Sequence, residues 1–314
     1  MSRKEKILNC FNARDELSID NARYQDFTRR LFNFLLEEDL GKGDVSQYPP
    51  AAFGKKIECA IIVKEEGVVA GLEEIIFLLG QYRVKVLTDF LDGDIIKIGD
   101  VLLKLQGEAG KILALERTVL NILQRFCGIA TMTARYQSRI GRQDCFIIGT
   151  RKTLFGFWDK KAVQSGGGLT HRLNLEDAVM LKENHLDLLK KNGVSIFETL
   201  ENIIRKNKGL RFIEIEVTYE QEFWEMARNL EKVKFDVPKV LMFDHFTVHQ
   251  IRNLIEEMQK RGIYDDLLLE ASGDITLETV SSYAEAGIDV ISSGALTHSV
   301  KGLDLTLLFN YQNK

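Results

Sequence analysis

Charged and hydroxyl side chains follow a series of short apolar runs in the second half of the chain. In a parallel barrel, side chains at the carboxyl ends of the strands converge on one mouth, where such enzymes carry out their chemistry. We therefore expect these polar side chains to line one pocket. They are Thr150, Arg151 and Lys152 after the first run, Lys182 after the second, Glu216 in the third, Asp244 after the fourth, and Ser272-Gly273 and Ser293-Gly294 after the last two.

The positive side chains of this set predict an anionic ligand. Arg151, Lys152 and Lys182 are joined by the pair His171-Arg172, which lies between the first two runs. Cations gathered in one pocket repel one another, so the cluster favours a ligand that carries several negative charges. Three adjacent glycines, Gly166–Gly168, precede the His-Arg pair. They predict a loop whose backbone approaches the ligand, with a flexible linker as the alternative.

The remaining polar residues predict how a metal ion and a phosphate group are held. Glu216 and Asp244 carry the oxygen ligands that Mg²⁺ uses beside phosphates, directly or through water. Ser272-Gly273 and Ser293-Gly294 predict phosphate-binding loops, because backbone N–H groups are unobstructed at glycine and point outward at a helix start. We expect the first of these helices over 275–286.

The apolar runs themselves predict the fold. Six of them succeed one another at spacings that leave room for a helix, which indicates parallel strands joined by right-handed crossovers. A barrel is preferred over a doubly wound sheet. The first half mixes short β-rich runs with helices predicted at 21–36, 72–79 and 112–136 and is expected to be an α+β domain. The six runs are Cys145–Gly149, Ala178–Leu181, Phe212–Val217, Val240–Phe243, Leu267–Leu269 and Asp289–Ile291.

Length and composition exclude several classes of protein. The 314 residues allow one large α/β unit or two domains, and 45% hydrophobic residues exclude a disordered chain. A formal net charge of −4 gives no general attraction to nucleic acid or to a membrane surface. No run reaches the roughly 18 apolar residues that a membrane helix needs. The four cysteines are far apart, which excludes a CxxC zinc or disulfide pattern and favours the cytoplasm.

Taken in order, these motifs resemble the quinolinate phosphoribosyltransferase family, the carboxylating nicotinate-nucleotide pyrophosphorylases of NAD biosynthesis. The resemblance runs from about Phe34 to Leu305. So many blocks in one order make a chance similarity very improbable. The blocks are Glu38–Asp44, Glu116–Asn121, Gly128–Thr131, Thr150–Thr153, Gly166–Arg172, Leu181–His185, Glu214–Val217, Glu270–Gly273 and Ser293–Gly294.

The resemblance implies an architecture of two α/β domains. An N-terminal extension (1–20) precedes an α/β sandwich domain (21–125), which the C-terminal tail (299–314) completes. An incomplete, TIM-like α/β barrel (126–298) carries the phosphoribosyltransferase site. The family also implies a homodimer in which Arg117 enters the neighbouring subunit's active site.

The resemblance implies a pentosyltransferase that takes phosphoribosyl pyrophosphate and quinolinate to nicotinate mononucleotide, diphosphate and CO₂. Its small-molecule substrates would require Mg²⁺, held by Glu216 and Asp244. The implied catalytic residues are Lys152, Lys182, Glu216 and Asp244. The implied substrate-binding residues are Arg117, Thr150, Arg151, Lys152, His171, Arg172, Lys182, Glu216, Asp244, Ser272, Gly273, Ser293 and Gly294.

The chain departs from the family pattern at several points. Gly149 stands where an aspartate is usual, Leu154–Trp158 replaces a Thr-Pro-Gly-x-Arg continuation, and His245 replaces an asparagine. A paralogue of the type associated with molybdate transport, with another acceptor, is therefore an alternative. Two further alternatives are a non-catalytic binder of phosphorylated ligands and a Schiff-base lyase that uses Lys182.

Overall fold

The structure is a computed structural model that describes residues 2–309, so the last five residues of the predicted C-terminal tail lie outside it. Its contacts divide the chain into two compact units. The barrel unit comprises the residues up to Ala13, Arg135–Lys152 and Gly168–Gly294. The sandwich unit comprises Arg14–Ala134, Thr153–Gly167 and the residues from Ala295. Each unit is described separately.

Six parallel strands form the sheet of the barrel unit, in the order β6-β11-β10-β9-β8-β7. Most of their residues are buried, as expected of strands with helices outside them. The order ends at β6 and β7, and Leu169 adds an isolated parallel bridge to Ile148. The six strands correspond to the six predicted runs: β6 (Phe146–Ile148), β7 (Val179–Leu181), β8 (Ile213–Val217), β9 (Lys239–Asp244), β10 (Leu268–Ser272) and β11 (Val290–Ser292).

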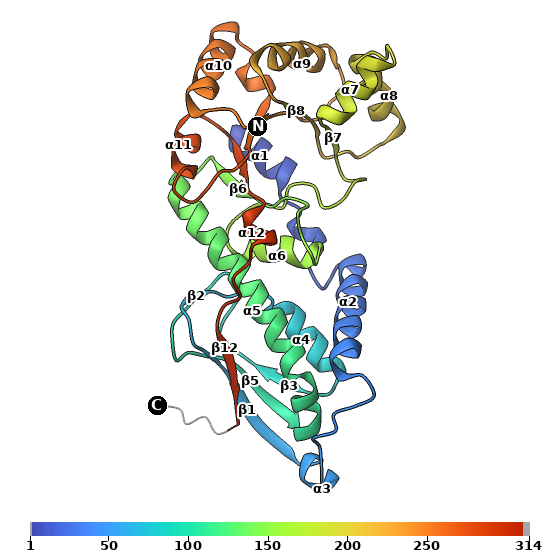
Figure 1. The fold of residues 1–314 in the computed structure, drawn as a ribbon, viewed down its shortest axis with the longest axis vertical. Coiled ribbons are helices and arrows are strands. Elements are labelled where there is room, and N and C mark those ends of the chain that lie inside the picture. The colour runs from blue at the N-terminus through green and yellow to red at the C-terminus, as the bar shows by residue number, and fades with distance from the viewer. Residues whose placement is uncertain (1, 310–314) are drawn as a thin grey trace. The chain divides into compact units, whose positions relative to one another are not determined.

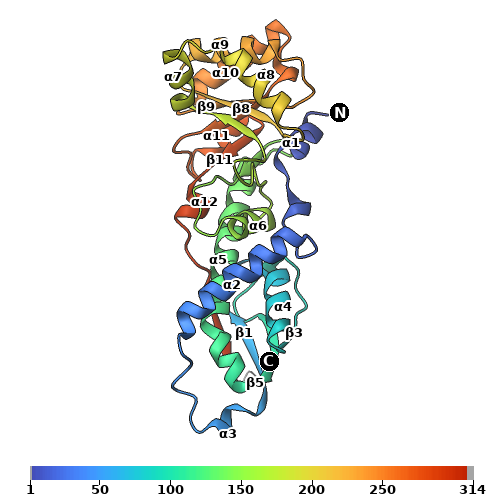
Figure 2. The same cartoon turned by 90° about the vertical axis from the view of Figure 1, so that its right-hand side faces the viewer.

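Helices cover the outside of these strands (Figures 1 and 2). The longest, α10, begins at a capping box between Thr247 and Gln250 and ends at Gly262, whose φ of 72° is the left-handed conformation that glycine adopts at low cost. The helices are α7 (Glu183–Lys191), α8 (Ile196–Lys206), α9 (Glu220–Lys232), α10 (Val248–Arg261) and α11 (Val280–Glu285), with a 3₁₀ turn η2 (Tyr264–Asp266).

The helix predicted over 275–286 is wrong at its start. The observed helix α11 begins only at Val280. Before it, the Thr276 backbone N–H donates to the Thr279 hydroxyl at 3.0 Å, and the Thr279 N–H donates to the Thr276 carbonyl at 3.2 Å. This local turn satisfies the backbone without a helix, which is the usual competition that threonine side chains offer.

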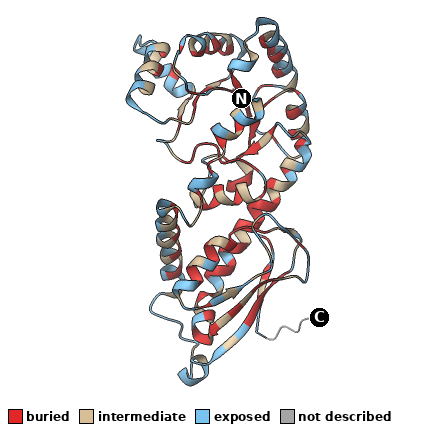
Figure 3. Ribbon diagram, turned by 180° about the vertical axis from the view of Figure 1, so that it is seen from behind, coloured by how far each residue is buried: buried red, intermediate tan, exposed pale blue. Residues whose placement is uncertain are grey.

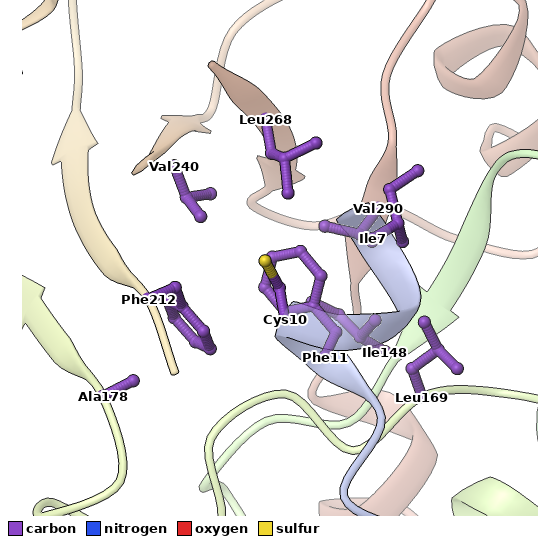
Figure 4. Packing of buried hydrophobic residues seen from close by; sticks show 10 residues of the cluster. All are labelled: Ile7, Cys10, Phe11, Ile148, Leu169, Ala178, Phe212, Val240, Leu268 and Val290. Atoms are coloured by element: carbon purple, nitrogen blue, oxygen red, sulfur yellow. The ribbon is translucent and has the colours of Figure 1, made fainter. Parts of the chain in front are cut away.

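The first helix, α1 (Arg3–Phe11), belongs to the interior of the barrel unit. Ile7, Cys10 and Phe11 are fully buried and pack against residues at the amino ends of the strands (Figure 4). The helix begins with a capping box, in which Ser2 is the N-cap residue. The N-terminal residues, which the sequence left as an extension, therefore form part of the core. The surrounding residues at or directly before the strand starts are Ala178, Phe212, Val240, Leu268 and Val290.

The sandwich unit is built on an antiparallel sheet with the order β12-β1-β5-β3. The last described strand returns to pair with β1, from Ala60↔Leu308 to Val63↔Leu305. Buried residues, red in Figure 3, run along these strands. The strands are β1 (Lys56–Val63), β3 (Lys85–Leu87), β5 (Val101–Glu108) and β12 (Leu305–Leu308), and β2 (Gly67–Val68) pairs separately with β4 (Ile95–Ile96).

The predicted helices of the first half correspond to α2, α4 and α5. Among residues 2–309, none of the helices combines the length and apolar character needed to cross a bilayer. The helices of this unit are α2 (Ala22–Leu40), α3 (Pro50–Phe53), α4 (Leu72–Gln81), the part of α5 (Ala109–Ile140) up to Ala134, α6 (Phe157–Ser165) and α12 (Ala295–His298), with a 3₁₀ turn η1 (Arg14–Glu16).

The compact units do not begin and end at the boundaries predicted after residues 20, 125 and 298. Residues up to Ala13 pack with the barrel unit, and Thr153–Gly167 packs with the sandwich unit. Two contacts hold α6 there: Asp159 accepts two hydrogen bonds from Arg125 at 2.7 Å, and the Trp158 indole donates to Thr28 at 3.0 Å. In both cases a segment packs with residues that are distant in sequence. A division of the chain into consecutive domains cannot represent such packing.

Gly166 illustrates a packing requirement that a pair of substitutions can test. A Cβ atom at this position would lie 2.3 Å from the Ala130 carbonyl oxygen, whereas exposed Gly80 in α4 has open space around it. We predict that Gly166→Ala lowers the free energy of unfolding by about 1–3 kcal/mol. Gly80→Ala should raise it by up to about 1 kcal/mol, because alanine favours the helix. Denaturant unfolding of both variants measures the difference; equal effects would contradict the packing argument.

Candidate active site

Strands β8 and β10 direct alternate side chains into the interior of the barrel unit. Successive residues of a strand point to opposite faces, so every second residue shares one face. Phe212 and Leu268 lie in the apolar cluster around α1, which we call the floor. Glu214 and Glu270, two residues further along each strand, form a charged layer with His171. Two residues further still, Glu216 and Ser272 stand at the carboxyl ends, which we call the mouth.

The charged layer consists of one imidazole and two buried carboxyl groups. His171 Nε2 lies 2.9 Å from Glu214 Oε2 and 3.3 Å from Glu270 Oε2, and all three residues are buried. Burial opposes the charge on His171, but the two carboxylates outweigh it and raise the pKa of the ring to about 9. Burial and the neighbouring Glu270 raise the pKa of Glu214 to about 7. Burial opposes the charge on Glu270 as well, but the charged ring holds the pKa of this carboxyl below its usual value.

The pKa shifts of this layer favour protons on its imidazole and on one of its two carboxyl groups. The three ligand atoms lie within 4.8 Å of one another, a spacing that also suits a metal. A protonated imidazole has no lone pair to donate, however, and the shifts favour His171 and Glu214 protonated beside an ionised Glu270. In that state the layer is electrically neutral. Glu214 and Glu270 enter the sequence prediction as the first residues of two family blocks, without a role of their own; their spacing of two from Glu216 and Ser272 was the available signal.

The mouth brings one predicted cation beside a predicted carboxylate. The Lys182 ammonium forms an ion pair with Glu216, whose side chain is 12% exposed. Asp244 stands at the end of the neighbouring strand, half-buried, and Asp244 Oδ2 lies 2.9 Å from His245 Nδ1. Two carboxylates therefore lie at adjacent strand ends, which is the donor chemistry that Mg²⁺ prefers.

Four further predicted residues lie after β6 and before β7. Arg172 is buried and donates to the Ala178 carbonyl at 3.3 Å. Burial and the positive charge of nearby Arg151 lower the pKa of Arg172, which shows that these two cations repel each other. Arg151 and Lys152 are exposed, and the Lys152 N–H donates to the Thr150 hydroxyl at 3.0 Å. Arg151 and Arg172 therefore lie close enough to interact.

The loop after β10 has a backbone that requires glycine. Gly273 has a φ of 95°, and a Cβ atom there would lie 2.7 Å from the His245 ring. His245 is itself left-handed, with a φ of 58°. This loop is no helix start, since α11 begins at Val280. The Ser293-Gly294 loop does lead directly into the short helix α12.

The predicted site residues fall into the two units unequally. Arg117 lies on α5 in the sandwich unit, where it is exposed. All the others belong to the barrel unit: Thr150, Arg151, Lys152, His171, Arg172, Lys182, Glu216, Asp244, Ser272, Gly273, Ser293 and Gly294.

The aromatic residues that replace the family pattern after Lys152 serve mainly in packing. Trp158 is fully buried in the sandwich unit and lies edge-on to Phe155, while Arg125 lies over the Phe155 ring at 5.0 Å. Leu154 is 78% exposed. Gly166 likewise has a packing reason, its close approach to Ala130, so the glycine run is not explained by a ligand alone.

An incomplete parallel barrel with cations and carboxylates at the carboxyl ends of its strands is typical of barrel enzymes that act on phosphorylated substrates. Comparison with known families makes this class specific. The profile described as the C-terminal domain of quinolinate phosphoribosyl transferase matches residues 129–308, and that of its N-terminal domain matches 48–127. The chain therefore belongs to the quinolinate phosphoribosyltransferase family.

Individual relatives agree with this assignment. The chain is 36% identical to a probable carboxylating nicotinate-nucleotide pyrophosphorylase of Archaeoglobus fulgidus, over 84% of this chain and 97% of the relative. It is 33% identical to one of Bacillus subtilis, over 91% and 94%. The solved structure of NadC from Streptococcus pyogenes is 32% identical, covers 89% of this chain and 94% of its own, and has a TM-score of 0.76. The predicted family, fold class and pentosyltransferase class are confirmed.

The charged layer predicts a titration that can be observed directly. We expect His171 to stay protonated above pH 6.5 and to lose its proton at about pH 9. Its contribution to the free energy of unfolding is complete below pH 6.5 and is lost as the pH rises through 9, because the folded state binds the proton more tightly. An NMR titration of the ring protons, assigned with His171→Gln, measures this midpoint. A midpoint near 6.5 would contradict the buried charge cluster.

Proposed function

We propose that this chain transfers the phosphoribosyl group of phosphoribosyl pyrophosphate to quinolinate and removes one carboxylate as CO₂, giving nicotinate mononucleotide and diphosphate. The observation that carries this proposal is the ion pair between Lys182 and Glu216 at the mouth of the barrel unit, the unit that also contains every other predicted site residue except Arg117. The family membership and the names of the relatives support the same reaction in NAD biosynthesis.

The charges of the mouth suit both substrates. Arg151, Lys152, Arg172 and Lys182 supply more positive charge than one phosphate needs, and quinolinate brings two carboxylates. As the bond from ribose C1 to diphosphate breaks, fixed cations stabilise the departing negative charge. The pyridine nitrogen then forms its bond to C1, aligned by the side chains that hold the two carboxylates.

Decarboxylation follows from the first step. A ribosylated ring is a pyridinium, so the bond from C2 to its carboxylate can break with the electron pair held by the cationic ring. CO₂ leaves, and C2 then takes a proton. No covalent enzyme intermediate is needed, and the protein contributes mainly positioning and electrostatic stabilisation.

Mg²⁺ is part of the proposal, with Glu216 and Asp244 as its protein ligands, directly or through water. The two carboxylates at adjacent strand ends fit its preference for oxygen, and their partial exposure leaves room for water and phosphate oxygens. When bound, the ion would neutralise negative charge on the diphosphate. Ser272-Gly273 and Ser293-Gly294 are proposed to bind the 5-phosphate.

A homodimer is also part of the proposal. Arg117 is exposed on α5, as a residue offered to a second subunit must be. A cytoplasmic location is supported by four free cysteines, all buried.

The alternatives fit the described contacts less well. The Lys182 amine is engaged with Glu216, whereas a Schiff-base lysine has to be open to a carbonyl group. The altered segment Leu154–Trp158 suggested another acceptor or a non-catalytic binder. Its largest side chain, Trp158, is buried in the sandwich unit. His245 and Gly149 stay as departures that the substrate panel below tests.

The proposed reaction predicts equal release of diphosphate and CO₂ when the protein meets Mg²⁺, phosphoribosyl pyrophosphate and quinolinate. Lys182→Ala should lower kcat/KM by about 100-fold or more, because it removes a cation that stabilises the transition state. Coupled assays of diphosphate and CO₂ with a panel of pyridine carboxylates measure both.

Lys190→Ala is the matched control for that substitution. Lys190 lies on α7 with its Nζ 3.9 Å from Glu222 Oε1 and is 41% exposed, so its loss should leave kcat/KM near the wild-type value. Turnover with nicotinate alone, or no turnover with any pyridine carboxylate, would refute the proposed reaction.

The proposed dimer predicts complementation between two inactive variants. Arg117→Ala and Lys182→Ala subunits, unfolded together and refolded as a mixture, should regain about a quarter of the wild-type activity, because half the dimers are mixed and each has one intact site. Refolding each variant alone is the control. No recovery in a mixture shown by native mass spectrometry to contain mixed dimers would exclude the shared site.

A further inference from the structure

The N-terminal helix α1 lies outside the family profiles, which begin at residue 48. Nothing in its sequence suggests chemistry: no motif of the proposed active site falls between Arg3 and Phe11. Nevertheless it occupies the middle of the barrel unit's floor, with Ile7, Cys10 and Phe11 fully buried (Figure 4). Its contacts at either end show what it does there.

The amino end of α1 is fixed to the strands by Arg3. Its guanidinium donates to both carboxylate oxygens of Asp289, at 2.6 and 2.7 Å, and to the carbonyl groups of Tyr264 and Leu267. It also lies 3.8 Å from the centre of the Tyr264 ring. Because a bidentate arginine pair is rigid, this end of α1 has a defined position.

The carboxyl end of α1 contacts the segment that carries His171. The Phe11 ring stacks on the His171 imidazole, with centroids 5.6 Å apart and planes inclined by 11°. The Phe11 carbonyl accepts hydrogen bonds from the Thr170 N–H at 2.9 Å and from its hydroxyl at 2.8 Å. The Thr170 hydroxyl in turn accepts one from the Ala13 N–H at 3.0 Å. Phe11 and Thr170 therefore form a junction between the floor and the charged layer.

His171 needs such support because its backbone is strained. Its φ of 53° is left-handed, a conformation that costs a non-glycine residue free energy and persists only where the surroundings enforce it. The ring is held on one face by Phe11 and at its nitrogen by Glu214 and Glu270. Arg172 follows directly in the chain and its guanidinium donates to the Ala178 carbonyl, so the strained residue determines where the side chain of that cation starts.

We propose that α1 is a positioning element of the active site, in which Phe11 and the Thr170 hydroxyl hold His171 and thereby place Arg172 for its anionic substrate. Phe11 and Thr170 are positioning residues, since they touch His171 and its backbone rather than the substrate. The inference rests on the proposed function, because it takes quinolinate as the ligand of Arg172.

Two pairs of variants test this inference. Phe11→Leu keeps an apolar side chain but removes the stacked ring, and Ile7→Val is its control in the same buried cluster. Thr170→Val removes the hydroxyl at nearly constant volume, and Thr170→Ser retains it. If Phe11→Leu does not fold, the threonine pair alone decides the question. Thermal unfolding establishes which variants are folded.

The measurements separate positioning from general stability. We expect Phe11→Leu and Thr170→Val to raise the Kd for quinolinate, measured by calorimetry, about tenfold, because a displaced cation binds less well. Ile7→Val and Thr170→Ser should stay within twofold of the wild type. The NMR signals of the His171 ring protons should move in Phe11→Leu, since the stacked ring no longer shields them, and should stay in place in Ile7→Val.

Arg172→Ala distinguishes the possible failures. If it weakens quinolinate binding while Phe11→Leu and Thr170→Val bind like their controls, the positioning role of α1 is refuted and the proposed function stands. If Arg172→Ala leaves the Kd unchanged, the assignment of Arg172 to quinolinate fails, and this inference fails with it.

Discussion

Two glutamates lie in the interior of the barrel unit, and the rest of the site depends on the positively charged imidazole of His171 between them. Glu214 and Glu270 are completely or almost completely buried, where an unpaired carboxylate is costly. His171 supplies a positive charge between them, and with Glu214 protonated this charge balances the ionised Glu270, so the layer is neutral. The layer separates an apolar floor from a charged mouth, so displacing the imidazole would disturb both.

This constraint connects residues that serve different purposes. The floor around α1 provides the aromatic ring on which the imidazole stacks, and the arginine that follows the imidazole in the chain donates to the Ala178 carbonyl. The same alternation along β8 and β10 that buries Phe212 and Leu268 brings Glu216 and Ser272 to the mouth. Packing, proton placement and substrate binding are therefore carried by successive layers of the same strands.

Departures from the family pattern are absorbed mainly by packing. Trp158 is buried in the sandwich unit, where its indole donates to Thr28, and Asp159 forms an ion pair with Arg125. Much of the altered segment after Lys152 is therefore structural. His245 is different, because its ring lies at the mouth against Asp244 and Gly273. It is the altered side chain whose contacts bear most directly on the choice of acceptor.

The sequence alone determined the six parallel strands, the three long helices of the first half, the cationic character of the mouth and the family. The strands, the helices and the cationic residues depend on local periodicity and on residue types at strand ends, which are visible in one dimension, whereas the family follows from the resemblance of the ordered motif blocks to those of a known family. Only the tertiary structure placed α1 in the floor and joined Thr153–Gly167 to the sandwich unit. It also paired His171 with Glu214 and Glu270 and began α11 at Val280 rather than at 275. Most of these features arise from contacts between residues far apart in the chain, which leave no local pattern, and the late start of α11 arises from a threonine turn that competes with the helix.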